Sequence, residues 1–305
     1  MTVRVAERPD PEPDPAANRP AGRGPVPVLQ RRRRTPGQYA VLVALVVLAV
    51  VMLLPFAIVV VNALKSPAEY STKGPLTLPE GFDLQGIKDF WVRVDFGQKL
   101  LNSALISASV AVLATVLSLF NAYALGIGRI KGRMPVLAVL IMANTLPQEA
   151  LVYPLYYLAK QVGLYDTRLS VIIIFTAIQS AFGTYLLSSV LSGFPTEILE
   201  AARMDGANVW QTLWRIVFPI SRPTLSVLLV LFFIWTWNEF LLPLIFLISN
   251  DQQTVSVALG VLQGQRLMDA TMTSASAVLG VIPTVVFFLI FQRTLTRGIT
   301  MGAVK

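Results

Sequence analysis

The sequence predicts an all-α membrane protein that crosses the bilayer six times. Of its 305 residues, 54% are hydrophobic and only 14% are charged, whereas soluble domains carry about 25% charged residues. Six apolar runs are each long enough to cross a bilayer, which takes about 20 helical residues. Cysteine and histidine do not occur in the sequence. Disulfides and the commonest general base and metal ligand are therefore excluded, and a helical bundle in lipid is expected.

The apolar runs follow one another along residues 37–305, which we assign to one transmembrane domain. Leu, Ile, Val and Phe each favour insertion by about 0.3–0.6 kcal/mol at the membrane centre. Two runs contain a carboxylate, Glu149 and Glu239, at a cost of about 2.5–3.5 kcal/mol each that the apolar neighbours offset. The predicted spans cover approximately residues 39–64, 100–127, 134–157, 169–191, 223–247 and 275–295.

Residues 1–36 are expected to form a disordered tail, since their prolines and charges leave little to bury. No cleavable signal is expected before the first span, which then serves as an uncleaved anchor. The run Arg31–Arg34 lies beside that span. A patch for nucleic acid or anionic lipid is one interpretation of this run, and a positive-inside anchor is the favoured one.

Basic residues are unevenly distributed between the two sides of the predicted bundle. With the N-terminus inside, 17 lysines and arginines lie on the inner side and 8 on the outer side. The positive-inside rule therefore predicts that both termini and the loop at 194–219 are cytoplasmic, with larger external loops at 65–99 and 249–274. The basic residues that orient the protein in the membrane account for its net charge of +8. No nucleic-acid partner is therefore predicted.

The loop at 194–219 has the pattern of two short helices separated by a glycine. Pro195 suits the first helical position, and Gly206 suits the left-handed conformation that ends a helix. Asn208 is a predicted N-cap, with Gln211 completing a capping box. Pro219 is expected to stop the second helix, because it has no N–H to donate. Each helix is too short to cross a bilayer, so the pair is predicted to lie outside the membrane.

The same loop resembles a known motif through residues at fixed spacing. Glu200-Ala201-Ala202, Gly206, Ile216 and Phe218-Pro219 resemble the "EAA" loop of the permeases of binding-protein-dependent ABC importers. The family usually has leucine at the position of Phe218 and often a second acidic residue at that of Leu199. In that family the loop docks into a cleft of the ATPase subunit.

Two further stretches extend the resemblance to the carbohydrate branch of this family, the maltose G-type permeases. The ending 302–305 (Gly-Ala-Val-Lys) is similar to theirs, although the glycine that often follows is missing here. A Trp-Asn-Glu-Phe run followed by Pro-Leu, residues 237–244, is also typical of them.

The resemblance implies an inner-membrane permease subunit of a prokaryotic, ATP-driven sugar importer. It implies four kinds of partner: a second, different permease, two ATPase subunits that bind the ATP and magnesium, an extracytoplasmic solute-binding protein, and a small sugar. The tail residues Gly302 and Lys305 would reach between the ATPases. The residues assigned to ATPase coupling are Glu200, Ala201, Ala202, Asp205, Gly206, Ile216 and Pro219.

Polar residues inside the spans are candidates for a translocation path. In the fifth span they are Trp235, Asn238 and Glu239, with hydrogen bonding between helices and packing at the lipid boundary as the alternative. The fourth span offers a polar stripe, with the same alternative. Its residues are Gln179, Ser180, Thr184 and Tyr185. The prolines at 147 and 154 mark either a broken helix beside a transport cavity or, the favoured interpretation, an ordinary tyrosine-rich belt.

Catalysis by this chain is not expected. It contains no G-x-x-x-x-G-K-[ST] sequence to cradle nucleotide phosphates, and no carboxylate cluster with metal-ligand spacing. No cofactor is predicted, and ATP hydrolysis is expected on a separate chain. The alternative function is an ion- or proton-coupled secondary transporter that uses Glu149 or Glu239 as a relay and needs no ATPase. A membrane-embedded transferase or hydrolase is disfavoured by the missing histidines and cysteines.

Overall fold

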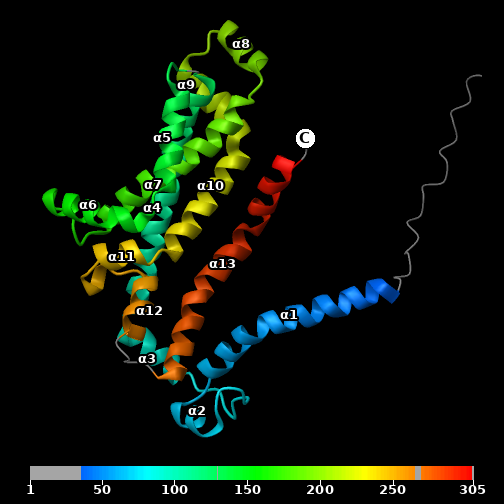
Figure 1. Ribbon diagram of the computed structural model, residues 1–305, viewed down its shortest axis with the longest axis vertical. Coiled ribbons are helices and arrows are strands. Elements are labelled where there is room, and N and C mark those ends of the chain that lie inside the picture. The colour runs from blue at the N-terminus through cyan, green and yellow to red at the C-terminus, as the bar shows by residue number, and fades with distance from the viewer. Residues whose placement is uncertain (1–35, 129, 265–268, 304–305) are drawn as a thin grey trace, which may run out of the picture. The chain divides into compact units, whose positions relative to one another are not determined.

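The computed structural model describes residues 36–128, 130–264 and 269–303, which form helices and connecting loops without a strand in these ranges (Figure 1). The predicted all-α fold class is thus confirmed for this part of the chain. The helices are α1 (Pro36–Ala63), α2 (Pro67–Lys73), α3 (Gln85–Arg93), α4 (Phe96–Ala122), α5 (Arg133–Thr145), α6 (Gln148–Gln161), α7 (Arg168–Ser192), α8 (Thr196–Met204), α9 (Val209–Thr212), α10 (Phe218–Asn238), α11 (Leu241–Phe246), α12 (Val255–Gly264) and α13 (Ala270–Ala303). Shorter turns are the π-helical η2 (Tyr123–Ile127) and η3 (Leu213–Val217) and the 3₁₀ turn η4 (Asn250–Gln252).

The chain divides into two units, Met1–Leu53 and Leu54–Lys305. In the first unit, residues 36–53 form the greater part of α1, and every one of them is exposed. A helix that is apolar all round needs lipid or partner helices around it. Of the predicted tail at 1–36, only Pro36 lies within the described residues, and it begins α1.

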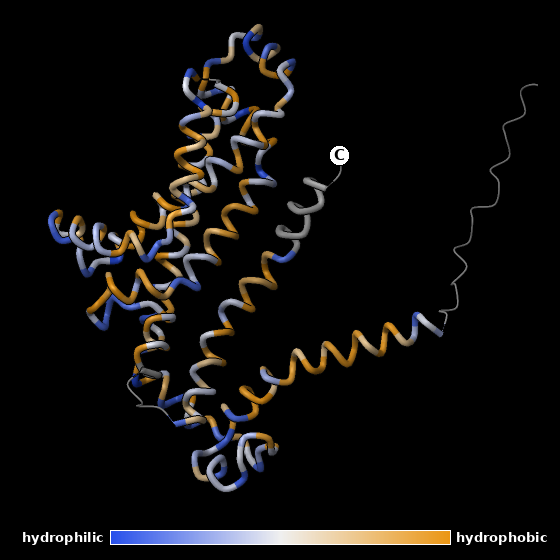
Figure 2. Tube along the Cα trace, in the orientation of Figure 1, coloured by the Kyte–Doolittle hydropathy of each residue, from blue (hydrophilic) through white to orange (hydrophobic). Residues whose placement is uncertain are grey.

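Five described helices are long and apolar enough to cross a membrane, and their hydrophobic residues run along most of their length (Figure 2). Besides α1 and α7, they are Phe96–Ile127, Val209–Asn238 and Ala270–Gln292. The predicted number of six spans is reached when the bent pair α5–α6 is taken as one span. Helix α13 continues to Ala303 and so includes Gly302, whereas Lys305 lies outside the described residues.

The third predicted span, 134–157, is not one straight helix. Its residues fall in α5 and α6, whose axes are bent by 98° at a short break. The break is at Leu146 and Pro147, both in extended conformation. A proline disfavours the helical conformation of the residue before it and clashes with the carbonyl four residues back. The less favoured interpretation, a broken helix, therefore holds at Pro147, whereas Pro154 lies inside α6 without interrupting it.

The fifth predicted span, 223–247, is also interrupted. Helix α10 ends at Asn238, and the short α11 begins at Leu241. Pro243 explains the break, because it has no N–H to donate to the carbonyl of Glu239, four residues earlier. That carbonyl instead accepts a hydrogen bond from the Ser256 hydroxyl at 2.6 Å.

Pro219 does not stop the helix that precedes it, contrary to the sequence prediction. Helix α9, the π turn η3 and α10 form one continuous helical segment, Val209–Asn238. Within η3 the N–H of Phe218 bonds to the carbonyl of Leu213, five residues back. Pro219 therefore follows a widened turn and lies at the start of α10, where its missing N–H is tolerated.

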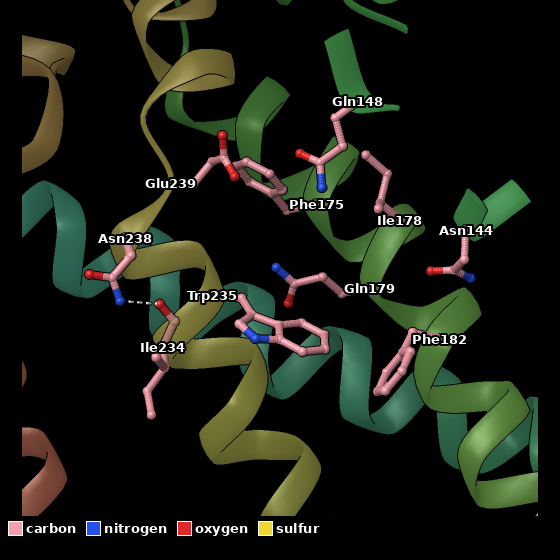
Figure 3. A pocket seen from close by; sticks show the side chains of 10 residues that line it. All are labelled: Asn144, Gln148, Phe175, Ile178, Gln179, Phe182, Ile234, Trp235, Asn238 and Glu239. Carbon is pink, nitrogen blue, oxygen red and sulfur yellow. Dashed lines mark hydrogen bonds between the residues drawn. The ribbon is translucent and has the colours of Figure 1, made fainter. Parts of the chain in front are cut away.

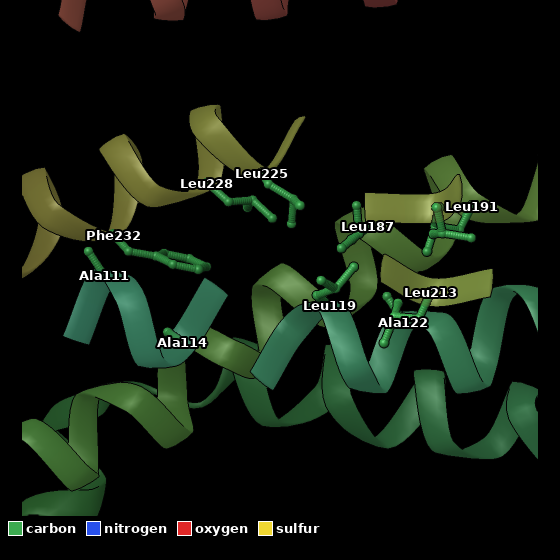
Figure 4. Close-up of a cluster of buried hydrophobic side chains, with 11 residues drawn as sticks. Ala111, Ala114, Leu119, Ala122, Leu187, Leu191, Leu213, Leu225, Leu228 and Phe232 are labelled. Carbon is green, nitrogen blue, oxygen red and sulfur yellow. The ribbon is translucent and has the colours of Figure 1, made fainter. Parts of the chain in front are cut away.

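Helices α4, α7 and α10 form the centre of the second unit (Figure 4). Small residues line α4 where it meets α7, and Gly183 lies opposite them on α7. Lipid tails are as apolar as the side chains, so burying apolar side chains between helices in a membrane gains little free energy. Small residues such as these let the helices approach closely, and the resulting van der Waals packing holds them together. The buried cluster comprises Ala111, Ala114, Leu119, Ala122, Leu187, Leu191, Leu213, Val217, Leu225, Leu228 and Phe232.

At the end of α4 opposite to α8, the loop before α12 is held by polar side chains of α4. The Asn102 amide donates to the carbonyls of Asp251 at 2.7 Å and Gln253 at 2.9 Å. Lys99 is fully buried and donates to the Asn250 carbonyl. Arg168 donates to the Asn102 side-chain oxygen at 3.1 Å, which ties α7 to the same junction. These contacts fix the loop that carries α12.

Asp166, in the loop between α6 and α7, holds the same neighbouring loop. It accepts hydrogen bonds from the Ser249 hydroxyl and, at 3.0 Å, from the Ser249 N–H. Partial burial alone would raise the pKa of Asp166, but hydrogen bonds from Ser249 and from the backbone of Ile248 outweigh it, so the pKa lies below its usual value.

A carboxylate whose pKa is lowered by folding adds stability above its unfolded pKa of about 3.9, and that stability is lost as pH falls through the folded value. We therefore expect Asp166→Asn to unfold at a lower temperature than the wild type at pH 6, with a difference that narrows at pH 3. Thermal unfolding in detergent at both pH values measures this. Ser249→Ala should reproduce part of the effect, and an Asp166→Asn difference that is as large at pH 3 would contradict the assignment.

Candidate functional site

A pocket of about 370 Å³, lined by both polar and apolar side chains, lies between α5, α6, α7 and α10, beside both helix breaks (Figure 3). Its lining combines three aromatic or aliphatic side chains of α7 with amides, one indole and one carboxyl group. The lining residues are Asn144, Gln148, Phe175, Ile178, Gln179, Phe182, Ile234, Trp235, Asn238 and Glu239. No lysine or arginine is among them.

The amide of Gln179 links the two walls of the pocket. Its nitrogen donates to the Thr236 hydroxyl of α10 at 2.8 Å. Its oxygen is buried and has no hydrogen-bond partner among the described residues. Leaving such a group unpaired costs about 1–3 kcal/mol, and because the oxygen has almost no accessible surface, a donor in the pocket would pair with it only after the side chain turned.

The end of α10 brings polar groups to the pocket. The Asn238 amide caps its own helix by donating to the Ile234 carbonyl at 2.8 Å (Figure 3). Glu239 has left the helical conformation, with ψ at 135°, and its carboxylate accepts from the N–H of Leu241 at 3.2 Å. The break at Glu239 thus turns a side chain that would sit within a membrane helix toward the pocket.

The structure brings together four of the residues that the sequence assigned to a translocation path: Gln179, Trp235, Asn238 and Glu239. The other three lie outside the pocket. The Thr184 hydroxyl accepts from Asn121 of α4 at 3.3 Å, so hydrogen bonding between helices, the alternative interpretation, holds for Thr184. The Ser180 hydroxyl donates to the Ala177 carbonyl of its own helix at 3.0 Å, and it is the Ser180 backbone carbonyl that accepts from Ser118 of α4, at 3.2 Å. Tyr185 is exposed and does not line the pocket.

Sequence reasoning missed several lining residues that two signals could have found. On α7, Phe175, Ile178, Gln179 and Phe182 follow the i, i+3, i+4, i+7 spacing of one helix face. Asn144 and Gln148 flank the proline break between α5 and α6. The predicted relay residue Glu149 is exposed and is not part of the pocket.

The second candidate site is the loop between α7 and α10, where the predicted caps are confirmed. Gly206 has φ of 74°, in the left-handed region. Its N–H bonds to the Arg203 carbonyl at 3.0 Å and that of Ala207 to the Ala202 carbonyl at 2.9 Å, which together close a Schellman motif. Asn208 and Gln211 form the reciprocal capping box. Pro195, expected at the first helical position, instead lies at the N-cap of α8.

Aromatic rings hold this loop against the bundle. Trp210 and Trp214 each present an edge to the ring of Phe120 on α4, at centroid distances of 5.9 and 6.2 Å. The Tyr123 hydroxyl reaches the Val209 carbonyl at 3.4 Å. A rigid connection therefore runs from the loop into α4.

The residues assigned to ATPase coupling differ in exposure. Glu200, Ala201, Asp205 and Gly206 are exposed, whereas Ala202 is buried against the bundle. Ile216 and Pro219 are half-buried. Large apolar side chains are also exposed on the same loop. They are Ile198, Met204, Val209 and Trp210.

Comparison with known proteins identifies relatives over most of the chain. The melibiose/raffinose/stachyose import permease protein MelC of Bacillus subtilis is 28% identical over 90% of this chain and 99% of its own length. The trehalose transport system permease protein SugB of Mycobacterium tuberculosis is 32% identical over 69% of this chain and 77% of its own length. These relatives are named as permeases, which agrees with a transport subunit and not with an enzyme.

The fold is shared with a solved structure, a bacterial ABC transporter involved in the import of the acidic polysaccharide alginate. The TM-score is 0.73 at 21% sequence identity, over 86% of this chain and 98% of the matched chain. At this identity the similarity concerns the fold.

A family model assigns the chain itself. The model described as "binding-protein-dependent transport system inner membrane component" matches residues 122–301, which contain both the pocket and the loop. The ion-coupled carrier considered as an alternative finds no support here. The chain belongs to the family of inner-membrane components of binding-protein-dependent transport systems, and is thus a multi-pass permease subunit.

Proposed function

We propose that this chain is the permease subunit of an ATP-driven importer whose substrate is a sugar. The observation that carries the proposal is the family match over 122–301, together with relatives that are named for oligosaccharide and trehalose transport. Family membership implies ATPase and solute-binding partners.

Coupling to the ATPases is assigned to the loop at 194–219. Its exposed residues Glu200, Ala201 and Asp205 would enter the ATPase cleft, while buried Ala202 and half-buried Ile216 hold the loop to the bundle. The exposed apolar side chains nearby and the aromatic connection to α4 support this role. When ATP closes the ATPase dimer, the loop would move as a unit and the spans would rock between inward-open and outward-open states.

The assembly that we propose contains a second, different permease and two ATPases in a prokaryotic inner membrane, with both termini cytoplasmic. The excess of basic residues on the side of the loop supports this orientation. Helix α13 reaches Ala303, and the proposed contact of Gly302 and Lys305 with the ATPases would extend from its end. The pocket between α7 and α10 would form part of the translocation path.

The test is to purify the tagged protein from its native membranes in mild detergent and identify its companions by mass spectrometry. We expect an ATPase with a G-x-x-x-x-G-K-[ST] sequence and a second multi-span permease. The complex in proteoliposomes, with its binding protein, should then take up radiolabelled melibiose, raffinose or trehalose only with ATP inside.

Two outcomes would contradict the proposal. One is uptake by the chain alone, without ATP, that disappears in Glu149→Gln or Glu239→Gln. The other is a complex whose ATPase responds to a solute that is not a sugar while none of the three sugars is transported.

A further inference from the structure

We propose that the pocket between α7 and α10 binds one ring of the transported sugar directly, and that Glu239 restricts it to uncharged sugars. This inference rests on the proposed function and goes beyond it, because a permease can form a path without contacting its substrate through a dedicated site. The pocket volume of about 370 Å³ lies within the range of small-molecule sites, about 300–1,000 Å³.

The aromatic wall of the pocket suits a sugar ring. Trp235 is 43% exposed, and its indole forms a T-shaped pair with Phe182 at a centroid distance of 5.1 Å and an angle of 68°. The fully buried Phe232 contacts the indole as well, at a centroid distance of 6.0 Å. The face of an indole is electron-rich and therefore attracts the C–H groups on the flat side of a pyranose. A ring that is held by its neighbours and is still partly exposed loses little entropy when it stacks on a ligand.

The polar groups of the pocket suit hydroxyls. Asn144, Gln148, Gln179 and Asn238 each offer an amide, which both donates and accepts as a hydroxyl does. The buried oxygen of Gln179 lacks a partner, and it would accept a hydrogen bond from a sugar hydroxyl once the side chain turned it toward the pocket. Neutral amides opposite an aromatic face select a ligand that is apolar on one side and rich in hydroxyls on the other.

The charge of the pocket argues against acidic sugars. Glu239 is the one carboxyl group among the lining residues, and no basic side chain offsets it. A uronate bound here would bring a second negative charge to about 6 Å, which at an effective dielectric constant of about 20 weakens binding by roughly a hundredfold. The pocket is therefore unlike a site for an acidic polysaccharide, although the fold is that of an alginate importer.

The experiment is ligand-detected NMR by saturation transfer on the purified complex in nanodiscs, with two matched pairs of probes. These are glucose with glucuronate and galactose with galacturonate, which differ in having a hydroxymethyl or a carboxylate group. We expect transfer to the ring C–H protons of at least one neutral sugar and little to its uronate. Trp235→Ala should weaken the neutral signal by about tenfold, Trp235→Phe should keep most of it, and Glu239→Gln should admit the uronate.

Trp91→Ala is the matched control, since Trp91 is 44% exposed, lies on α3 and does not line the pocket. It should leave the signals unchanged. Co-purification of the partners and basal ATPase activity report whether each variant still assembles. A neutral signal that is absent in the wild type, or equal in Trp235→Ala, or matched by the uronate, would overturn the inference. Uptake of melibiose, raffinose or trehalose would meanwhile leave the proposed function intact.

Discussion

Gly206→Pro is expected to abolish sugar uptake while the permease still inserts and assembles. Gly206 has φ of 74°, whereas proline fixes φ near −65° and has no N–H for the bond to Arg203. Such a mismatch costs about 3 kcal/mol or more. The chain would therefore turn differently at residue 206, and α8 would shift relative to α9, which begins at the capping box. Uptake by proteoliposomes, with basal ATPase activity and subunit composition measured on the same sample, tests the prediction.

Two variants separate this backbone effect from the loss of space. A Cβ on Gly206 would meet no atom within 4 Å, so steric clash is not the cause. Gly206→Asn should keep much of the uptake, because asparagine tolerates the left-handed region. Gly193→Ala, in the same loop between α7 and α8, is the control. Gly193 has negative φ, and an added Cβ would lie 3.7 Å from the Val190 carbonyl oxygen, which is an ordinary contact. Normal uptake by Gly206→Pro would show that α8 does not transmit the ATPase movement.

Gly183→Val is expected to prevent correct packing of the bundle. A Cβ at Gly183 would lie 2.2 Å from the Ser118 hydroxyl oxygen, 2.9 Å from the Ser118 Cβ and 2.8 Å from the Phe232 ring. Both neighbours are fully buried between α4, α7 and α10. Overpacking usually costs about 1–3 kcal/mol of folding free energy, and three contacts this short place Gly183→Val at the upper end of that range. We expect a Tm lowered by about 10 °C, or no folded protein.

Size-exclusion chromatography and thermal unfolding in detergent measure the effect of Gly183→Val. Gly280→Ala on α13 is the comparison, because its Cβ would meet only the flexible end of Leu259. It should therefore cost much less. Adding Ser118→Gly to Gly183→Ala should restore part of the lost stability, since it removes two of the three clashes. A Gly183→Val protein as stable as the wild type would mean that α4 and α7 are not packed as described.

Local interactions were the part of the fold that the sequence predicted well. The Schellman motif at Gly206 and the capping box of Asn208 and Gln211 involve partners at most five residues apart, so their geometry is encoded in short patterns. Breaks in long helices were harder to predict. Proline at 147 and 243 ends a helix, while proline at 219 does not, because a π turn precedes it.

The site shows the same division. Residue type alone marked Gln179 and Glu239 as candidates. It could not separate Gln179 from Ser180 and Thr184, which lie on the same polar stripe of α7 but do not line the pocket. The difference lies in the neighbouring group that each side chain meets: Ser180 bonds within α7 and Thr184 bonds to α4, whereas Gln179 donates to α10 and lines the pocket. Which neighbour a helix face meets depends on tertiary packing, which a single sequence does not reveal.

Two π turns lie next to the loop between α7 and α10: η2 follows α4, and η3 joins α9 to α10. A π turn holds one residue more than an α-turn, and each residue of an α-helix corresponds to a rotation of about 100°. Deleting one residue within 213–217 would therefore let the π turn become an α-turn and leave α8 and α9 close to their present direction. Deleting one residue from the regular part of α10 would instead rotate α8 and α9 around the helix axis by about 100°. The π turn thus marks the place on this helix where a one-residue change in chain length disturbs the direction of the loop least.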